Sequence, residues 1–349
     1  MAISLIMGIF LSFFGYVLTP PLLRLMGTPA DIIDQSITYM RIVFVGMWTL
    51  TVYNMGSGIL RAIGDSRRPL IFLVISSVIN IVLDILLIGP FGMGVAGAAW
   101  ATVIAQFVSG VLVVLTLMRS VDSYRLIPKD LKIHRHVAAA ILKIGVPAGT
   151  QSVSINLSNV IIQAQINSFG SQAVAGAGAA AKVDGFLYMT INAFGLAVMT
   201  FVGQNYGAKR MDRVRRVGRT GLIMAAGTGL VLGMLIFWQS DNLIALFNDN
   251  PEVVRYGTLM VSVLAPTYWI ISAGEVYSGF LRGVGAAVYP MVSSIVTMGV
   301  LRVAFIFVVR LFWDNIMAVY LSYPFSWILQ AVSMLLYVRS GRWDKKQAL

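Results

Sequence analysis

Three polar side chains stand out within otherwise apolar segments of the sequence. Asn80 and Asp84 are four residues apart, so they share one face of a helix, and Thr102 lies in the next apolar segment. A carboxylate, an amide oxygen and a hydroxyl are hard oxygen ligands of the kind that bind an alkali cation. Alternatively, Asp84 carries a proton, because low-dielectric surroundings favour the neutral form of a carboxylic acid. A third interpretation places Asp84 near water, because Gly89 and Pro90 mark the nearby end of its segment.

Four further charged residues lie within apolar segments: Lys182 and Asp184 in one, Glu275 and Arg302 in two later ones. Unpaired charges are costly in a low-dielectric medium, so charges of opposite sign tend to pair there. We therefore expect structural ion pairs, with Glu275 joined to Arg302 or to Lys182. The alternative is that Glu275 is a carboxylate of a substrate cavity.

Amide side chains follow one another along a single segment, namely Gln151, Asn156, Asn159, Gln163 and Gln165. They are candidates for the polar wall of a substrate cavity. Hydrogen bonding between neighbouring helices explains the same residues equally well.

The composition decides what kind of element positions these residues. Hydrophobic residues make up 58% of the 349-residue chain and charged residues only 11%, whereas soluble domains carry about 25% charged residues. The apolar runs are about 18 to 30 residues long, enough for helices to cross a bilayer, and they lack the alternation of β-barrel strands. The sequence therefore predicts an all-α polytopic membrane protein. No cysteine is present, and we expect neither a transition-metal site nor catalytic residues.

We expect about ten transmembrane helices, roughly at 1–24, 36–62, 69–88, 93–118, 137–168, 172–205, 214–238, 253–281, 287–310 and 314–338. The net charge of +12 is concentrated in alternate connections, whereas the opposite ones are acidic. This positive-inside pattern predicts a multi-pass protein of the plasma (inner) membrane with both termini in the cytoplasm, and it argues against a nucleic-acid partner. The basic stretches are Arg61 to Arg68, Arg119 to Arg135, Lys209 to Arg219 and Arg339 to Lys346.

Two copies of one unit are visible in the sequence. Residues 58–69 (GILRAIGDSRRP) recur as residues 279–290 (GFLRGVGAAVYP), about 221 positions later. Aligning the copies leaves about 85 residues of the second copy without a partner, so we expect the first copy to lack two opening helices. The predicted parts are an incomplete N-lobe of four helices (1–118), a cytoplasmic inter-lobe loop (119–136), a C-lobe of six helices (137–339) and a cytoplasmic tail (340–349).

The chain resembles multidrug and toxic compound extrusion (MATE) transporters. The resemblance rests on the paired segments above and on residues 92–102 (GMGVAGAAWAT), 145–151 (GVPAGTQ) and 203–208 (GQNYGA), in this order. It implies two lobes around a central cavity, with this chain matching family helices three to twelve. It also implies export of organic, often cationic, compounds against sodium or proton entry.

The resemblance also implies roles for single residues. Asn80, Asp84 and Thr102 match positions of an N-lobe cation site, although the aspartate of family helix one has no counterpart here. In some branches of the family the C-lobe carries an acidic pair. The matching positions here are Ile155 or Asn156 and Ile271, which are not acidic, so the N-lobe is the expected coupling site.

We therefore predict sodium- or proton-coupled antiport of organic, cationic compounds by alternating access, with no cofactor besides Na⁺ or H⁺. The expected partners are the lipid bilayer and small organic substrates, and the expected state is a monomer. One alternative is a flippase for a lipid-linked precursor, which ranks lower because such proteins have a strongly cationic cavity, whereas Lys182 and Arg302 are the only candidates here for cations in the membrane interior. Another is a truncated remnant that does not transport.

Overall fold

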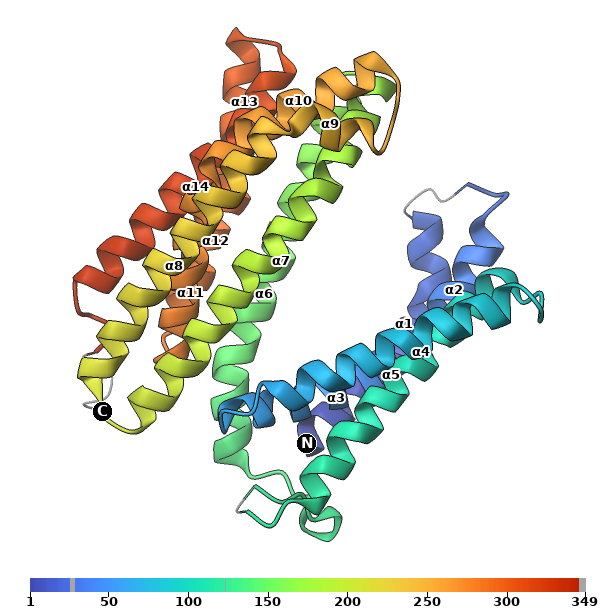
Figure 1. Ribbon diagram of the computed structural model, residues 1–349, viewed down its shortest axis with the longest axis vertical. Helices are drawn as coiled ribbons and strands as arrows, with labels where there is room; N and C mark the ends of the chain where they lie inside the picture. The colour runs from blue at the N-terminus through green and yellow to red at the C-terminus, as the bar shows by residue number, and fades with distance from the viewer. Residues whose placement is uncertain (26–28, 123, 345–349) are drawn as a thin grey trace. The chain divides into compact units, whose positions relative to one another are not determined.

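The computed structural model describes residues 1–25, 29–122 and 124–344 (Figure 1). The last five residues of the predicted tail and one residue of the predicted inter-lobe loop, position 123, lie outside the described residues. Every regular element in the described part of the chain is helical, as predicted. The chain forms two compact units, unit 1 from Met1 to Ala138 and unit 2 from Ala139 to Leu349.

Unit 1 is a bundle of five helices. Small residues of α5 let its neighbours approach closely, with Gly97 facing α4 and Gly110 facing α3. The hydroxyl of Ser76 on α4 donates to the carbonyl of Ala105 at 2.7 Å. The helices are α1 (Ala2–Leu25), α2 (Ile33–Val45), α3 (Met47–Ala62), α4 (Arg67–Ile88) and α5 (Gly94–Arg119).

Unit 2 contains the longer helices, and α11 lies against α7, α8 and α14. A 3-10 turn, η1 (Pro128–Asp130), precedes α6, which begins three residues before the unit boundary. The elements are α6 (Arg135–Asn167), α7 (Ser171–Gly207), α8 (Met211–Trp238), α9 (Ser240–Ala245), α10 (Pro251–Leu264), η2 (Ala265–Thr267), α11 (Tyr268–Gly283), α12 (Val288–Ser294), η3 (Ile295–Leu301), α13 (Arg302–Phe312) and α14 (Ile316–Arg339).

Both copies of the repeated segment form the same turn at the end of a helix. In unit 1, the Gly64 N–H donates to Arg61 and the next N–H donates to Leu60 at 2.9 Å. In unit 2, the Gly285 N–H donates to Arg282 and the next N–H donates to Leu281 at 2.8 Å. These are the two bonds of a Schellman motif, which needs a left-handed residue. The glycines supply it, with φ of +92° and +81°.

Two of the long spans in unit 2 are interrupted. Pro266 lies in the 3-10 turn η2, which separates α10 from α11, because proline removes a helical hydrogen bond. Between α12 and α13 the backbone forms a π-helix, η3, which the sequence analysis did not predict. Such segments are rare and are frequent at functional sites.

Eight spans in the described chain are long and apolar enough to cross a membrane, and the bent pair α2–α3 makes a ninth. The two helices of that pair meet at 43°. The remaining predicted span, 137–168, forms the helix α6 but is not among these spans. Its run of amide side chains is the reason, because each lowers the mean hydropathy.

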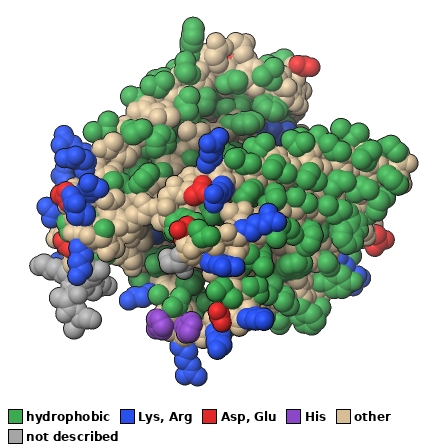
Figure 2. Space-filling model, turned by 60° about the horizontal axis from the view of Figure 1, so that its bottom comes forward, with side chains coloured by type: hydrophobic (Ala, Val, Ile, Leu, Met, Phe, Trp, Pro, Cys, Tyr) green, Lys and Arg blue, Asp and Glu red, His purple; other side chains and the backbone are tan. Residues whose placement is uncertain are grey.

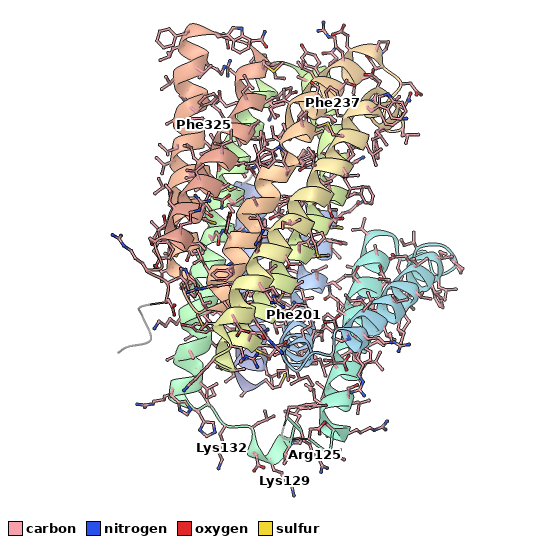
Figure 3. The ribbon with its side chains drawn as sticks, turned by 60° about the vertical axis from the view of Figure 1, so that its left-hand side comes forward. Arg125, Lys129, Lys132, Phe201, Phe237 and Phe325 are labelled. Atoms are coloured by element: carbon pink, nitrogen blue, oxygen red, sulfur yellow. The ribbon has the colours of Figure 1, made fainter. Side chains whose placement is uncertain are left out.

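Apolar side chains cover much of the surface, as expected for contact with lipid (Figure 2). Phe186 is 73% exposed and Leu311 80%. Charged side chains gather instead at helix ends and connections. In Figure 3, Arg125, Lys129 and Lys132 lie on the connection after α5, whereas Phe201 and Phe237 lie toward opposite ends of unit 2.

Candidate functional site

The first candidate site lies on α4 of unit 1, an uninterrupted apolar helix. Asn80 and Asp84 are both half-buried and lie one helical turn apart. The Nδ2 atom of Asn80 and the Oδ1 atom of Asp84 are buried, yet neither has a hydrogen-bond partner among the described residues. A buried polar atom without a partner costs about 1 to 3 kcal/mol, and more when the group is charged. Two such atoms one turn apart therefore indicate a place for a ligand.

Thr102 lies on α5, which packs antiparallel against α4. Two close approaches fix the register of the pair, with Ser76 bonded to Ala105 and Leu87 next to Gly97. This register places Asn80 at about the height of Thr102. The Thr102 hydroxyl nevertheless donates to the carbonyl of Ala98 on its own helix, at 3.0 Å. Within the described chain, no hydrogen bond joins Thr102 to Asn80 or Asp84, so the three predicted ligands share one region without contacting one another.

The second candidate site is a cavity of about 330 Å³ within unit 2. Five of the polar residues singled out in the sequence line it: Asn156 and Asn159 of α6, Asp184 of α7, Glu275 of α11 and Arg302 of α13. Aromatic side chains complete the wall, among them Tyr188, Tyr323 and Trp327. The cavity therefore combines two carboxylates and one guanidinium with aromatic rings.

The predicted ion pairs of Glu275 are wrong for the described residues. No salt bridge joins Glu275 to Arg302 or to Lys182 there. The guanidinium of Arg302, whose residue is 2% exposed, instead donates to Ser326 Oγ at 2.7 Å and to Asn159 Oδ1 at 3.4 Å. It also lies over the ring of Tyr323, 4.9 Å from the centroid. Neutral acceptors and an aromatic face thus satisfy this buried cation.

Lys182 and Asp184 also have separate surroundings. The Lys182 side chain does not line the cavity, because its Nζ lies over the ring of Phe247, 5.0 Å from the centroid. Asp184 lines the cavity. The π-helix η3 directly precedes Arg302 and supplies Met298 to the same wall.

Gln151 belongs to a different polar group, outside this cavity. Its Nε2 donates to Ser294 Oγ at 2.7 Å, and Gln330 donates to the same oxygen at 2.7 Å. Arg282 in turn donates to Gln151 Oε1. Sequence reasoning missed this role for Arg282, Ser294 and Gln330. The available signal was the presence of serine and glutamine within apolar spans, together with the arginine of the repeated segment.

Buried polar groups within lipid-facing helices, in two units that repeat one turn, are typical of membrane transporters. The MatE family model matches residues 1–86 and 147–308. The chain belongs to this family of multidrug efflux transporters, whose members are transporters and not enzymes.

Named relatives extend the match over nearly the whole chain. The "Probable multidrug resistance protein YoeA" of Bacillus subtilis is 30% identical, over 99% of this chain and 76% of the relative. The "Probable multidrug resistance protein NorM" of Thermotoga maritima is 26% identical, over 91% of this chain and 70% of the relative.

Solved structures share the fold. A MATE family transporter of the MOP superfamily in the outward-facing conformation matches with a TM-score of 0.92. The match covers 98% of this chain and 77% of that one, at 22% identity. A MATE structure in the bent conformation gives a TM-score of 0.91 at the same identity.

Proposed function

We propose that the protein exports organic, cationic compounds in exchange for sodium ions or protons, and that Asp84 and Asn80 on α4 bind the coupling cation. The observation that carries the proposal is the buried carboxylate oxygen without a partner, Asp84 Oδ1, one helical turn from the amide of Asn80. A cation or a proton at the carboxylate removes the cost of that buried negative charge. Binding is thereby linked to a preference for one conformation of the transporter, which is the requirement for alternating access.

The substrate part of the proposal rests on the cavity of unit 2. Asp184 and Glu275 line it and form no salt bridge in the described chain, so their charges are available to a positively charged substrate. The rings of Tyr188, Tyr323 and Trp327 provide faces for an apolar or aromatic cation. This combination favours organic cations over anions as substrates.

The proposed orientation follows the charge of the connections. The protein would lie in the cell membrane with its basic connections and both termini on the cytoplasmic side. The inter-lobe connection carries Arg125, Lys129 and Lys132 (Figure 3), and its basic residues outnumber its two carboxylates, Asp122 and Asp130. The coupling ions would then enter from the opposite side and leave into the cytoplasm.

The test is transport by the full chain reconstituted in proteoliposomes. Efflux of a fluorescent organic cation is driven either by a sodium gradient at constant pH or by a pH gradient without sodium. Asp84→Asn should abolish the response to the gradient, because the neutral amide binds neither ion strongly. The matched control is Asp34→Asn, which neutralises an exposed carboxylate of the same unit and should transport normally. Normal gradient-driven efflux by Asp84→Asn would overturn the assignment.

A further inference from the structure

A second cavity of unit 2, which shares α11 with the polar one but is lined by different residues, has no role in the transport proposal. Its volume is about 540 Å³, and it is lined by α8, α11, α14 and the turn that follows α14. The floor is α11, because both α8 and α14 pack against that helix. Arg215 and Arg219 of α8 line one wall, Arg339 of α14 lines the other, and Trp343 closes the end.

The charge of this cavity is unbalanced. The side chains of Arg215, Arg219 and Arg339 form neither a hydrogen bond nor a salt bridge with any described residue. Arginines elsewhere, such as Arg310, do have a carboxylate partner. Asp344 is the only acidic residue of the lining, so three guanidinium groups face one carboxylate. Such a site attracts an anion, and guanidinium groups match the geometry of phosphate oxygens.

The rest of the cavity is apolar and held in place. The indole of Trp343 packs edge-on against Phe280, with the ring centroids 5.0 Å apart, and its N–H donates to the carbonyl of Val338 at 2.9 Å. Gly218 lies on the opposite wall, where an added Cβ would come within 3.0 Å of the Phe280 ring. The absence of a side chain at Gly218 therefore lets α8 and this aromatic wall approach each other.

An apolar path leads from the cavity along α11. Trp269, Ala273 and Tyr277 are spaced by four residues, so they follow one face of the helix. Trp269 is 45% exposed, and the other two are partly exposed. A free inorganic anion would use only the arginines, whereas an amphiphile would use both the arginines and this face.

We propose that this cavity binds the phosphate headgroup of an anionic phospholipid, with its acyl chains along α11. The guanidinium groups of Arg215, Arg219 and Arg339 donate hydrogen bonds to the phosphate oxygens. Trp343 and Tyr277 contact the glycerol region. The site lies at the basic end of unit 2. Figure 2 shows Lys and Arg side chains on the face of the molecule that is turned forward. The proposed cytoplasmic orientation of that end places it at an anionic leaflet, so this step rests on the proposed function.

Lipid binding can be measured on purified protein, independently of transport and of the orientation in the membrane. A failure of the lipid proposal can therefore be distinguished from a failure of the proposed function. The full chain is purified in mild detergent and titrated with phosphatidylglycerol, cardiolipin, phosphatidylethanolamine or inorganic phosphate. Bound lipid is counted by native mass spectrometry, and the melting temperature is recorded. The wild type should retain the two anionic lipids, and they should raise its melting temperature. Phosphatidylethanolamine and inorganic phosphate alone should do neither.

The variant Arg219→Gln/Arg339→Gln should weaken binding of phosphatidylglycerol about tenfold or more, because charge-assisted hydrogen bonds are lost. Arg219→Lys/Arg339→Lys keeps the charge and should retain most of the affinity. The control, Arg213→Gln/Arg216→Gln, removes the same number of charges, both from α8 and outside the cavity, and should bind nearly normally. Equal weakening in the control, or equal stabilisation by inorganic phosphate, would overturn the proposal.

Discussion

The two units contain the same turn but place their charged groups differently. After Gly64, unit 1 continues into α4, a regular helix that carries Asn80 and Asp84. After Gly285, unit 2 continues into α12, the π-helix η3 and α13. At the spacing of the repeat, the positions of Asn80 and Asp84 correspond to Leu301 and Phe305. The backbone turn is thus repeated, while the polar chemistry is not.

The difference extends to the charged residues of the two candidate sites, although both units contain other buried atoms without partners, such as Ser57 Oγ and Ser278 Oγ. In unit 1, polar atoms of Asn80 and Asp84 are buried without partners. In unit 2, Arg302 is buried but donates to Ser326 and Asn159. An unsatisfied group lowers the stability of the fold, whereas a satisfied one contributes to it. In unit 1, the carboxylate of Asp84 can therefore gain a partner when a ligand binds. In unit 2, Arg302 already has its partners and supports the cavity wall.

The largest expected difference in stability tests this contrast. Arg302→Met should lower the free energy of unfolding by about 3 kcal/mol, because Ser326 and Asn159 lose a charged partner inside the helices. Asp84→Asn should leave stability unchanged or raise it slightly, since a neutral amide is less costly to bury than a carboxylate. Denaturant titrations in mixed micelles measure both changes. An equal loss in both variants would show that Asp84 has a structural partner.

Packing around the repeated segment gives the next largest effect. A Cβ on Gly279 would lie 2.3 Å from the carbonyl oxygen of Gly195, whereas a Cβ on Gly58, the matching position, meets nothing within 4 Å. Gly279→Ala should therefore destabilise the protein by about 1 to 3 kcal/mol. Gly58→Ala should be neutral or stabilising by up to about 1 kcal/mol, because alanine favours the helix. Melting temperatures of the two purified variants test this, and a similar fall in both would contradict the asymmetry.

The smallest effect should be the same in the two units. Gly64→Ala and Gly285→Ala each place a side chain at a positive φ, where neither position has a neighbour within 4 Å. The cost is therefore that of the backbone alone, about 1 to 2 kcal/mol at each position. Matched thermal melts should show similar decreases. A decrease at only one glycine would mean that the two turns differ in a way their hydrogen bonds do not reveal.

The sequence predicted the helical fold and the repeated segment because both depend on local patterns. Long apolar runs specify helices, and the two glycines of the repeat specify its turns. The amide-rich helix α6 was also predicted as a span, although its composition makes it more polar than its neighbours. The π-helix η3 was not predicted, since its sequence, residues 295–301, is an ordinary apolar run.

The partners of buried charges could not be predicted in the same way. Opposite charge alone suggested Glu275 for Arg302, but position in space decides the pairing. Asn159, which does contact Arg302, is 143 residues away along the chain. Ser326 had no distinguishing feature in the sequence. The choice of Asn80 and Asp84 as a coupling site remains a prediction, and the partnerless atoms of both residues are what favour it.

The polar character of α6 affects how the chain is inserted into the bilayer during synthesis. A helix leaves the translocon for lipid when its apolar side chains outweigh its polar ones, and α6 is less apolar than α5 and α7 on either side of it. Gln151 of α6 obtains its partners from Arg282 and Ser294, which are 131 and 143 residues further along. The ribosome therefore makes α6 long before the segments that satisfy it. Its stable integration depends on neighbouring helices that hold it until the last third of the protein arrives.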